Sequence, residues 1–126
     1  MLLIGFRSCA ALFLCCLSLF PAQATEPARR TFELTITGSA VPAGQRVLHA
    51  LKGDVVTLRI ASDTAGELHI HGYRQAAMLA VAGKMELTFA VHATGRYRIE
   101  WHATGQRGKG DQHGPALATL EVRPRE

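Results

Sequence analysis

Short stretches in which apolar and polar residues alternate dominate the chain after residue 30, and they constrain its fold more than any other feature. Leu34 and Ile36 stand between polar residues in the first stretch, and Leu58 and Ile60 do so in a later one. A period of two places alternate side chains on one face of a β-strand. The pattern predicts strands at residues 31–37, 47–50, 55–61, 67–71, 76–81, 85–91, 96–102 and 116–122. No stretch keeps an apolar face at helical spacing for three turns, so we expect an all-β sandwich of about seven to eight short strands.

The first 24 residues have the composition of an export signal. Arg7 precedes a short apolar run at residues 10–20, and small residues follow up to Ala24. This order predicts a secretory signal peptide at residues 1–24, then a linker at 25–30 and one β-sandwich domain at 31–124. The run is shorter than the roughly 20 residues that span a membrane, so we expect no membrane span after cleavage. The lack of asparagine and the wealth of alanine, arginine and glycine favour a bacterial periplasm as its location.

The cysteines and the charge of the chain exclude several functions. Cys9, Cys15 and Cys16 all lie in the predicted signal, so the exported chain 25–126 would have no disulfide and no thiolate nucleophile or metal ligand. Of the fourteen Lys and Arg residues, Arg7 lies in the signal, which leaves thirteen against ten acidic residues. These basic residues are scattered and do not alternate with aromatic ones, so we expect no nucleic-acid partner.

Four segments in a fixed order carry a resemblance to a known family. They are KGDVVTLRI at 52–60, LHIHGY at 68–73, GRYRIEW at 95–101 and LEVRP at 120–124. Together they resemble bacterial periplasmic cupredoxin-like domains, above all the small stand-alone type similar to the cupredoxin domain of periplasmic iron-uptake proteins. The resemblance covers nearly all of the chain after the predicted signal. It implies a Greek-key β-sandwich, in agreement with the alternation.

The same resemblance implies where a copper ligand set would lie, and this chain departs from it. Blue-copper members of the family use a His, then a Cys, a second His and usually a Met. The first His corresponds to His71, whereas the Cys position falls at or near Trp101, and no methionine follows Met85. We therefore expect that the protein is not a blue-copper electron carrier.

Four of the six histidines are candidates for a metal site. His69 and His71 are two residues apart on one predicted strand, so both imidazoles project from the same face. His102 ends a strand and His113 ends a glycine-rich loop, and the resemblance implies that this loop end meets His71 at one pole of the sandwich. Imidazole ligands suit Cu(II), and Zn(II) less well in this context, so we expect a copper ion or no cofactor at all.

Structural explanations for these residues remain open. His102 shares a polar face with Glu100 and could simply pair with it, and the ring of His71 could bond to loop backbone. His49 and His92 are expected at the surface. Met78 and Met85 could be soft ligands for Cu(I), but their apolar surroundings favour packing in the core, as we expect for Trp101.

Three functional hypotheses follow from these residues. The first is an exported, monomeric cupredoxin-like protein that binds copper through His69, His71, His102 and His113. The second is a metal-free domain that binds a periplasmic or membrane protein partner. The third and weakest is a small copper enzyme, because the chain has neither the Gly-x-Ser-x-Gly nor the His-Glu-x-x-His motif and no residues that pair as acid and base.

Overall fold

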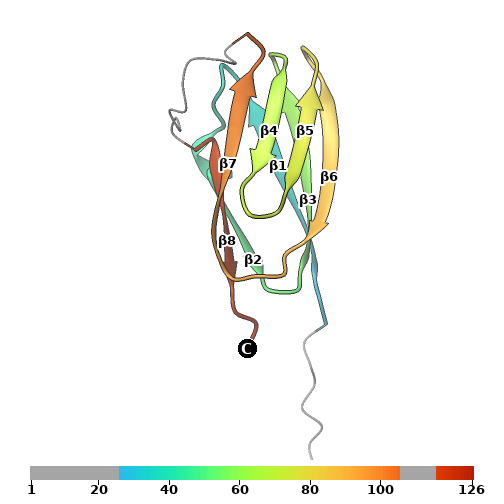
Figure 1. The fold of residues 1–126 in the computed structure, drawn as a ribbon, viewed down its shortest axis with the longest axis vertical. Coiled ribbons are helices and arrows are strands. Elements are labelled where there is room, and N and C mark those ends of the chain that lie inside the picture. The colour runs from blue at the N-terminus through green and yellow to red at the C-terminus, as the bar shows by residue number, and fades with distance from the viewer. Residues whose placement is uncertain (1–25, 106–115) are drawn as a thin grey trace, which may run out of the picture.

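The computed structural model describes residues 26–105 and 116–126, which form two β-sheets packed face to face (Figure 1). The three-stranded sheet has the order β1-β3-β6, with bounds Arg29–Ile36, Val55–Ser62 and Lys84–Ala90. The five-stranded sheet has the order β2-β8-β7-β4-β5, with bounds Val47–Leu51, Ala118–Arg123, Gly95–Ala103, Gly66–Ile70 and Gln75–Leu79. A short 3-10 helix, η1 (Ala43–Gln45), precedes β2.

The strands pair in both directions, and the chain crosses repeatedly from one sheet to the other. β1 runs parallel to β3 and β2 runs parallel to β8, whereas the other neighbours are antiparallel. The segments after β3, β5 and β6 each lead into the opposite sheet. This arrangement confirms the expected all-β sandwich, with eight strands in the described part of the chain.

The core lies between the sheets, where the alternating apolar residues meet. Leu34 and Leu58 from one sheet and Leu68 and Leu120 from the other are fully buried. The predicted strands are confirmed to within two residues at every end. β1 begins at Arg29, inside the segment predicted as a linker. All strands and all buried apolar side chains of the described residues lie between positions 29 and 123.

A buried carboxylate joins the two ends of the domain. Asp54 is fully buried in the turn between β2 and β3. It accepts hydrogen bonds from the backbone N–H groups of Leu51 and Ala28 at 2.9 and 3.1 Å, and from Nε of Arg30 at 2.5 Å. Arg125 forms a further ion pair with it. Burial raises the pKa of Asp54, but the bonds from Leu51, Arg30 and Ala28 outweigh this effect and lower the pKa to about 2.

The two methionines expected in the core are exposed instead. Met78 is 58% exposed and Met85 is 38% exposed. β5 is an edge strand, and its alternation turns Ala77 and Leu79 inward and Met78 outward. The apolar run around Met78 concealed this alternation, because every residue from 76 to 81 is apolar.

The predicted signal peptide at residues 1–24 lies outside the described residues. Within the ranges that the structure describes, no helix is long and apolar enough to cross a membrane.

Candidate functional site

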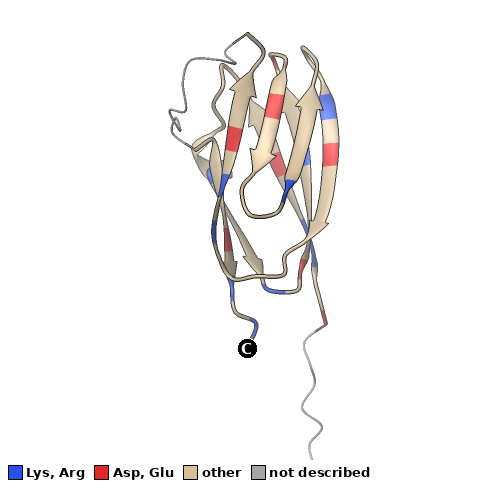
Figure 2. Ribbon diagram, in the orientation of Figure 1, with Lys and Arg blue, Asp and Glu red and all other residues tan. Residues whose placement is uncertain are grey.

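The outer face of β4 and β7 holds six polar side chains, which we call the His–Glu face. Inward-facing residues of β4, such as Leu68 and Ile70, are buried in the core, so the residues between them face outward. The His–Glu face consists of Glu67, His69 and His71 from β4 and its end, and of Arg98, Glu100 and His102 from β7. Figure 2 shows the acidic positions on both strands.

The register of β4 against β7 sets a histidine opposite a glutamate twice. Glu67 pairs with His102, and His69 pairs with Glu100. The ladder extends one step beyond β4, where the N–H of His71 donates to the carbonyl of Arg98 at 2.9 Å. Because the strands are antiparallel, the two Glu-x-His motifs at 67–69 and 100–102 form a square of alternating carboxylates and imidazoles.

Glu100 is the centre of the His–Glu face. It is only 7% exposed. Its Oε2 lies 2.9 Å from Nε2 of His71 and 3.6 Å from Nε2 of His102, and its Oε1 lies 3.3 Å from Nε of Arg98. A buried carboxylate requires such partners, since an isolated one would be costly to desolvate. Two imidazoles and one guanidinium therefore gather around a single acidic group.

His69 adds a second pair to the same face. Its Nε2 lies 2.5 Å from Oε1 of Glu67, and its ring is 5.7 Å from the ring of His102 in an edge-to-face arrangement. The side chains of His69 and His102 are about half exposed, at 46% and 51%. The imidazoles are thus accessible from solvent, whereas Glu100 beneath them is not.

The structure brings three of the four predicted site residues onto one surface. His69, His71 and His102 lie on the His–Glu face, whereas His113 lies outside the described residues. His71 and His102 lie at opposite ends of the β4–β7 pair, and both approach Glu100. The expected meeting of His71 with the end of the glycine-rich loop involves His113 and lies outside the described residues. The strand register, which alternation alone does not fix, determines where His71 and His102 lie relative to each other.

The structural explanations for the histidines receive partial support. His102 does approach Glu100, as the alternative reading expected. The ring of His71 pairs with Glu100. His49 and His92 are exposed, as predicted. The sequence analysis did not identify Glu67 as part of the site. The repeated Glu-x-His spacing at 67–69 and 100–102 is the signal in the sequence that could have indicated it.

The donor types on the His–Glu face suit a metal ion, although its side chains do not converge on one. Two ligands that each lie about 2.0 Å from one metal are roughly 2.8–3.3 Å apart. The distances from Oε2 of Glu100 to the His71 and His102 nitrogens are close to this range, at 2.9 and 3.6 Å. As the side chains stand, the described residues contain no group of three or more His, Cys, Asp or Glu that could hold a metal. Binding would therefore require the exposed imidazoles to turn.

Trp101 occupies the position at which the family resemblance places the copper-binding cysteine. Its indole faces inward and packs against the buried core. It also covers Gly66 on β4, where an added Cβ would collide with the ring. The side chain at this position thus supports packing between β7 and β4.

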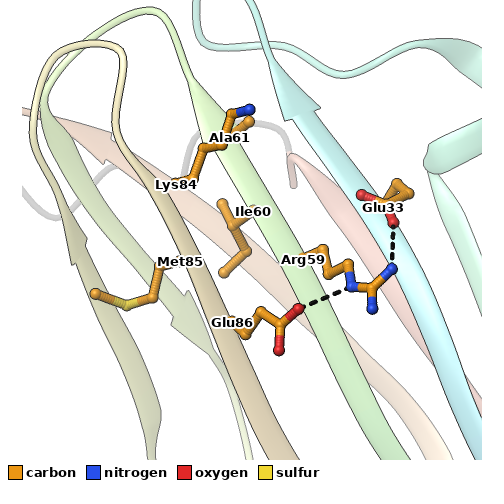
Figure 3. Close-up of a pocket in the computed structure, with 7 residues that line it drawn as sticks. All are labelled: Glu33, Arg59, Ile60, Ala61, Lys84, Met85 and Glu86. Carbon is orange, nitrogen blue, oxygen red and sulfur yellow. Dashed lines mark hydrogen bonds and ion pairs between the residues drawn. The ribbon is translucent and has the colours of Figure 1, made fainter.

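A second feature is a hollow of about 520 Å³ on the three-stranded sheet (Figure 3). Arg59 on β3 lies there between Glu33 and Glu86, at 3.7 and 2.8 Å. The hydrogen bond and charge of Glu86 raise the pKa of Arg59. All three side chains are more than half exposed, and exposed ion pairs of this kind contribute little to stability. We interpret these three residues as a charge network on a solvent-exposed face of the sheet.

The fold is similar to domains of copper oxidases of known structure. A multicopper oxidase, mgLAC, matches with a TM-score of 0.57 and 15% identity over 78% of this chain and 40% of its own. A blue copper oxidase from Nitrosomonas europaea matches with a TM-score of 0.58 and 17% identity over 78% and 40%. A multi-copper oxidase from Pseudomonas thermotolerans matches with a TM-score of 0.56 and 17% identity, over 80% of this chain and 31% of its own.

These similarities establish a cupredoxin-like fold for the chain. The chain spans less than half the length of each of these oxidases. No family model matches the sequence, and no curated protein does so either.

Proposed function

We propose that this chain is an exported cupredoxin-like protein that binds Cu(II) through the imidazoles of its His–Glu face. One observation carries the proposal: Nε2 atoms of His71 and His102 lie within 4 Å of the same buried Glu100 oxygen. The ion would lie between these two imidazole nitrogens and the Glu100 oxygen. His69, whose ring lies beside His102, would supply the third imidazole.

The choice of copper rests on donor chemistry and on fold. Imidazole binds Cu(II) more strongly than Zn(II) in a site of equal geometry, as the Irving–Williams order describes. The structural neighbours are named as copper oxidases. A thiolate is missing from residues 25–126, so we propose that the protein binds or delivers copper and does not carry electrons as a blue-copper protein. His113 belongs to the proposed ligand set on sequence grounds.

Copper titration of residues 25–126 tests this function. Elemental analysis of protein isolated from its native periplasm comes first, followed by Cu(II) and Zn(II) titration against a competing chelator. We expect one tightly bound Cu(II), with at least tenfold weaker binding in His71→Ala and in His102→Ala. His49→Ala is the matched control, because His49 is also exposed on this sheet and lies 3.9 Å from Glu121. Copper binding that is equal in all four proteins would contradict the proposal.

A metal-free binding domain is the second candidate, and an exposed apolar region favours it. Met78 and Val81, at the end of edge strand β5, are 58% and 69% exposed. Edge strands offer unpaired backbone groups to a partner strand. Protein that is isolated without metal and binds none in the titration would favour this function.

A further inference from the structure

A methionine lies in register with the histidines of the His–Glu face. Met78 on β5 pairs with Glu67 on β4, and Glu67 pairs with His102 on β7. Directly paired residues of neighbouring strands project to the same side of a sheet. Met78, Glu67 and His102 therefore form a row across three strands on the outer face. The exposure of Met78 leaves its thioether available in this row.

His69 lies diagonally beside this methionine. Its own partner on β5 is Ala76, two residues before Met78, and Ala76 is small and exposed. Diagonal neighbours in an antiparallel sheet are about 7–8 Å apart at Cα, within reach of long side chains. The unbranched chain of Met78 can extend across Ala76 toward the imidazole. Met78 and His102 are thus the ladder neighbours of Glu67 on either side, and His69 follows Glu67 on the same outward face of β4.

Resting on the copper-binding function proposed above, we propose that Met78 Sδ binds Cu(I) together with His69 and His102. A thioether is a soft ligand and selects Cu(I), whereas imidazole accepts both copper oxidation states and zinc. The His71–Glu100–His102 side of the face contains only nitrogen and oxygen donors and suits Cu(II). Met78 adds a sulfur donor to the same surface, and this donor suits Cu(I). The protein would then hold Cu(I) at the β5 edge and Cu(II) nearer Glu100, with His69 and His102 common to both sites.

Residues 25–126 allow a direct test, because the only sulfur atoms in this segment belong to Met78 and Met85. Cu(I) is titrated without oxygen against a chelator that holds the reduced ion, and Cu(II) is titrated separately. Met78→Leu removes the sulfur and retains the shape of the side chain. Met85→Leu is the matched control, since Met85 is also exposed but lies on β6 in the other sheet. Copper X-ray absorption of the Cu(I) form reports directly whether sulfur is bound.

We expect Met78→Leu to weaken Cu(I) binding at least tenfold, to leave Cu(II) binding within twofold, and to remove sulfur scattering from the absorption spectrum. Met85→Leu is expected to change none of these. If Met78→Leu binds Cu(I) as wild type does while His71→Ala still loses Cu(II), the thioether site is wrong and the copper-binding function stands. If wild type binds neither oxidation state, both proposals are overturned. Equal losses in Met78→Leu and Met85→Leu would also contradict a site specific to Met78.

Discussion

Nε2 of His71 lies 2.9 Å from Oε2 of Glu100, although the two residues come from different strands and are not direct partners in the ladder. Glu100 is buried and His71 is about half exposed. The pair therefore connects a solvent-accessible imidazole to a carboxylate held beneath the surface of the sheet. His102 approaches the same oxygen from the other end of the strand pair, at 3.6 Å.

Replacing Glu100 by Gln should weaken both the fold and the proposed copper site. The amide has nearly the same shape but removes the charge that faces His71, His102 and Arg98. We expect the free energy of unfolding to fall by about 1–3 kcal/mol, the usual cost of disturbing a buried hydrogen-bonded charge. Cu(II) affinity should fall at least tenfold, because the carboxylate either binds the ion or orients its imidazole ligands. Urea denaturation and chelator competition measure the two effects.

Glu121→Gln provides the comparison for this variant. Glu121 faces His49 on the same sheet but is less buried, at 22% side-chain exposure. We expect its substitution to change stability much less than Glu100→Gln does and to leave copper affinity unaltered. A Glu100→Gln protein as stable as wild type, with full copper affinity, would show that Glu100 neither stabilises the fold nor contributes to copper binding.

Asp54→Asn should destabilise the domain most at neutral pH. The change leaves Arg30 and Arg125 without their buried charge partner. Removing one member of a fully buried pair costs about 3–5 kcal/mol. We expect about 2–3 kcal/mol here, because the side chain of Arg30 is 40% exposed and can be solvated. Asp63→Asn is the control, since Asp63 is an exposed carboxylate that accepts a hydrogen bond from the Gly38 N–H.

The same substitution should flatten the acid dependence of stability. Hydrogen bonds lower the folded-state pKa of Asp54 from 3.8 to about 2. A lowered pKa contributes stability that is complete above pH 3.8 and is lost as the pH falls toward 2. Wild type should therefore lose more stability than Asp54→Asn between pH 4 and pH 2. Parallel curves for the two proteins over this interval would contradict the assigned pKa.

The sequence predicted the sandwich well because each strand shows its own alternation. Leu34 and Ile36 on β1 and Leu58 on β3 carry the predicted alternation, and all three are buried. Turn residues such as Gly53 and Gly95 have positive φ angles and mark the breaks between strands. These signals are local, so a single sequence contains them.

The candidate site was less predictable because it depends on which strands are neighbours and in what register. Parity placed His69 and His71 on one outward face, but no local signal pairs His69 with Glu100 or Glu67 with His102. Met78 was assigned to the core because its neighbours on both sides are apolar. Its exposure follows from the position of β5 at the edge of the sheet, which is a property of the assembled fold.

Gly66→Ala should disturb the β4–β7 pairing on which the His–Glu face depends. A Cβ at Gly66 would lie 2.7 Å from the carbonyl oxygen of His102 and would also collide with the ring of Trp101. Because one of these atoms belongs to the backbone, the strands themselves must shift. We expect a loss of about 1–3 kcal/mol, as for other overpacked sites, together with weaker copper binding.

Gly44→Ala is the matched control for this substitution. Nothing lies within 4 Å of a Cβ built at Gly44. Its stability and copper affinity should match those of wild type within about 0.5 kcal/mol. Equal behaviour of the two alanine variants would show that close approach at Gly66 does not fix the register.

Tyr73→Phe tests a pair of tyrosines that bond to the segment between β6 and β7. The hydroxyl groups of Tyr73 and Tyr97 both donate to the carbonyl of Ala93 at 3.0 Å, and their rings are 4.6 Å apart. Since Tyr97 continues to satisfy the shared acceptor, we expect a loss of only about 1 kcal/mol at neutral pH. Burial, followed by the hydrogen bond with Tyr97, raises the pKa of Tyr73 to about 12.

A raised pKa contributes stability that is complete below the ordinary value of 10.0 and is lost as the pH rises through about 12. Wild type should therefore lose more stability than Tyr73→Phe over this range. Absorbance of the phenolate, recorded together with circular dichroism, separates titration of the folded protein from unfolding. A Tyr73 that ionises near pH 10 while the fold is intact would show that its hydroxyl is open to solvent.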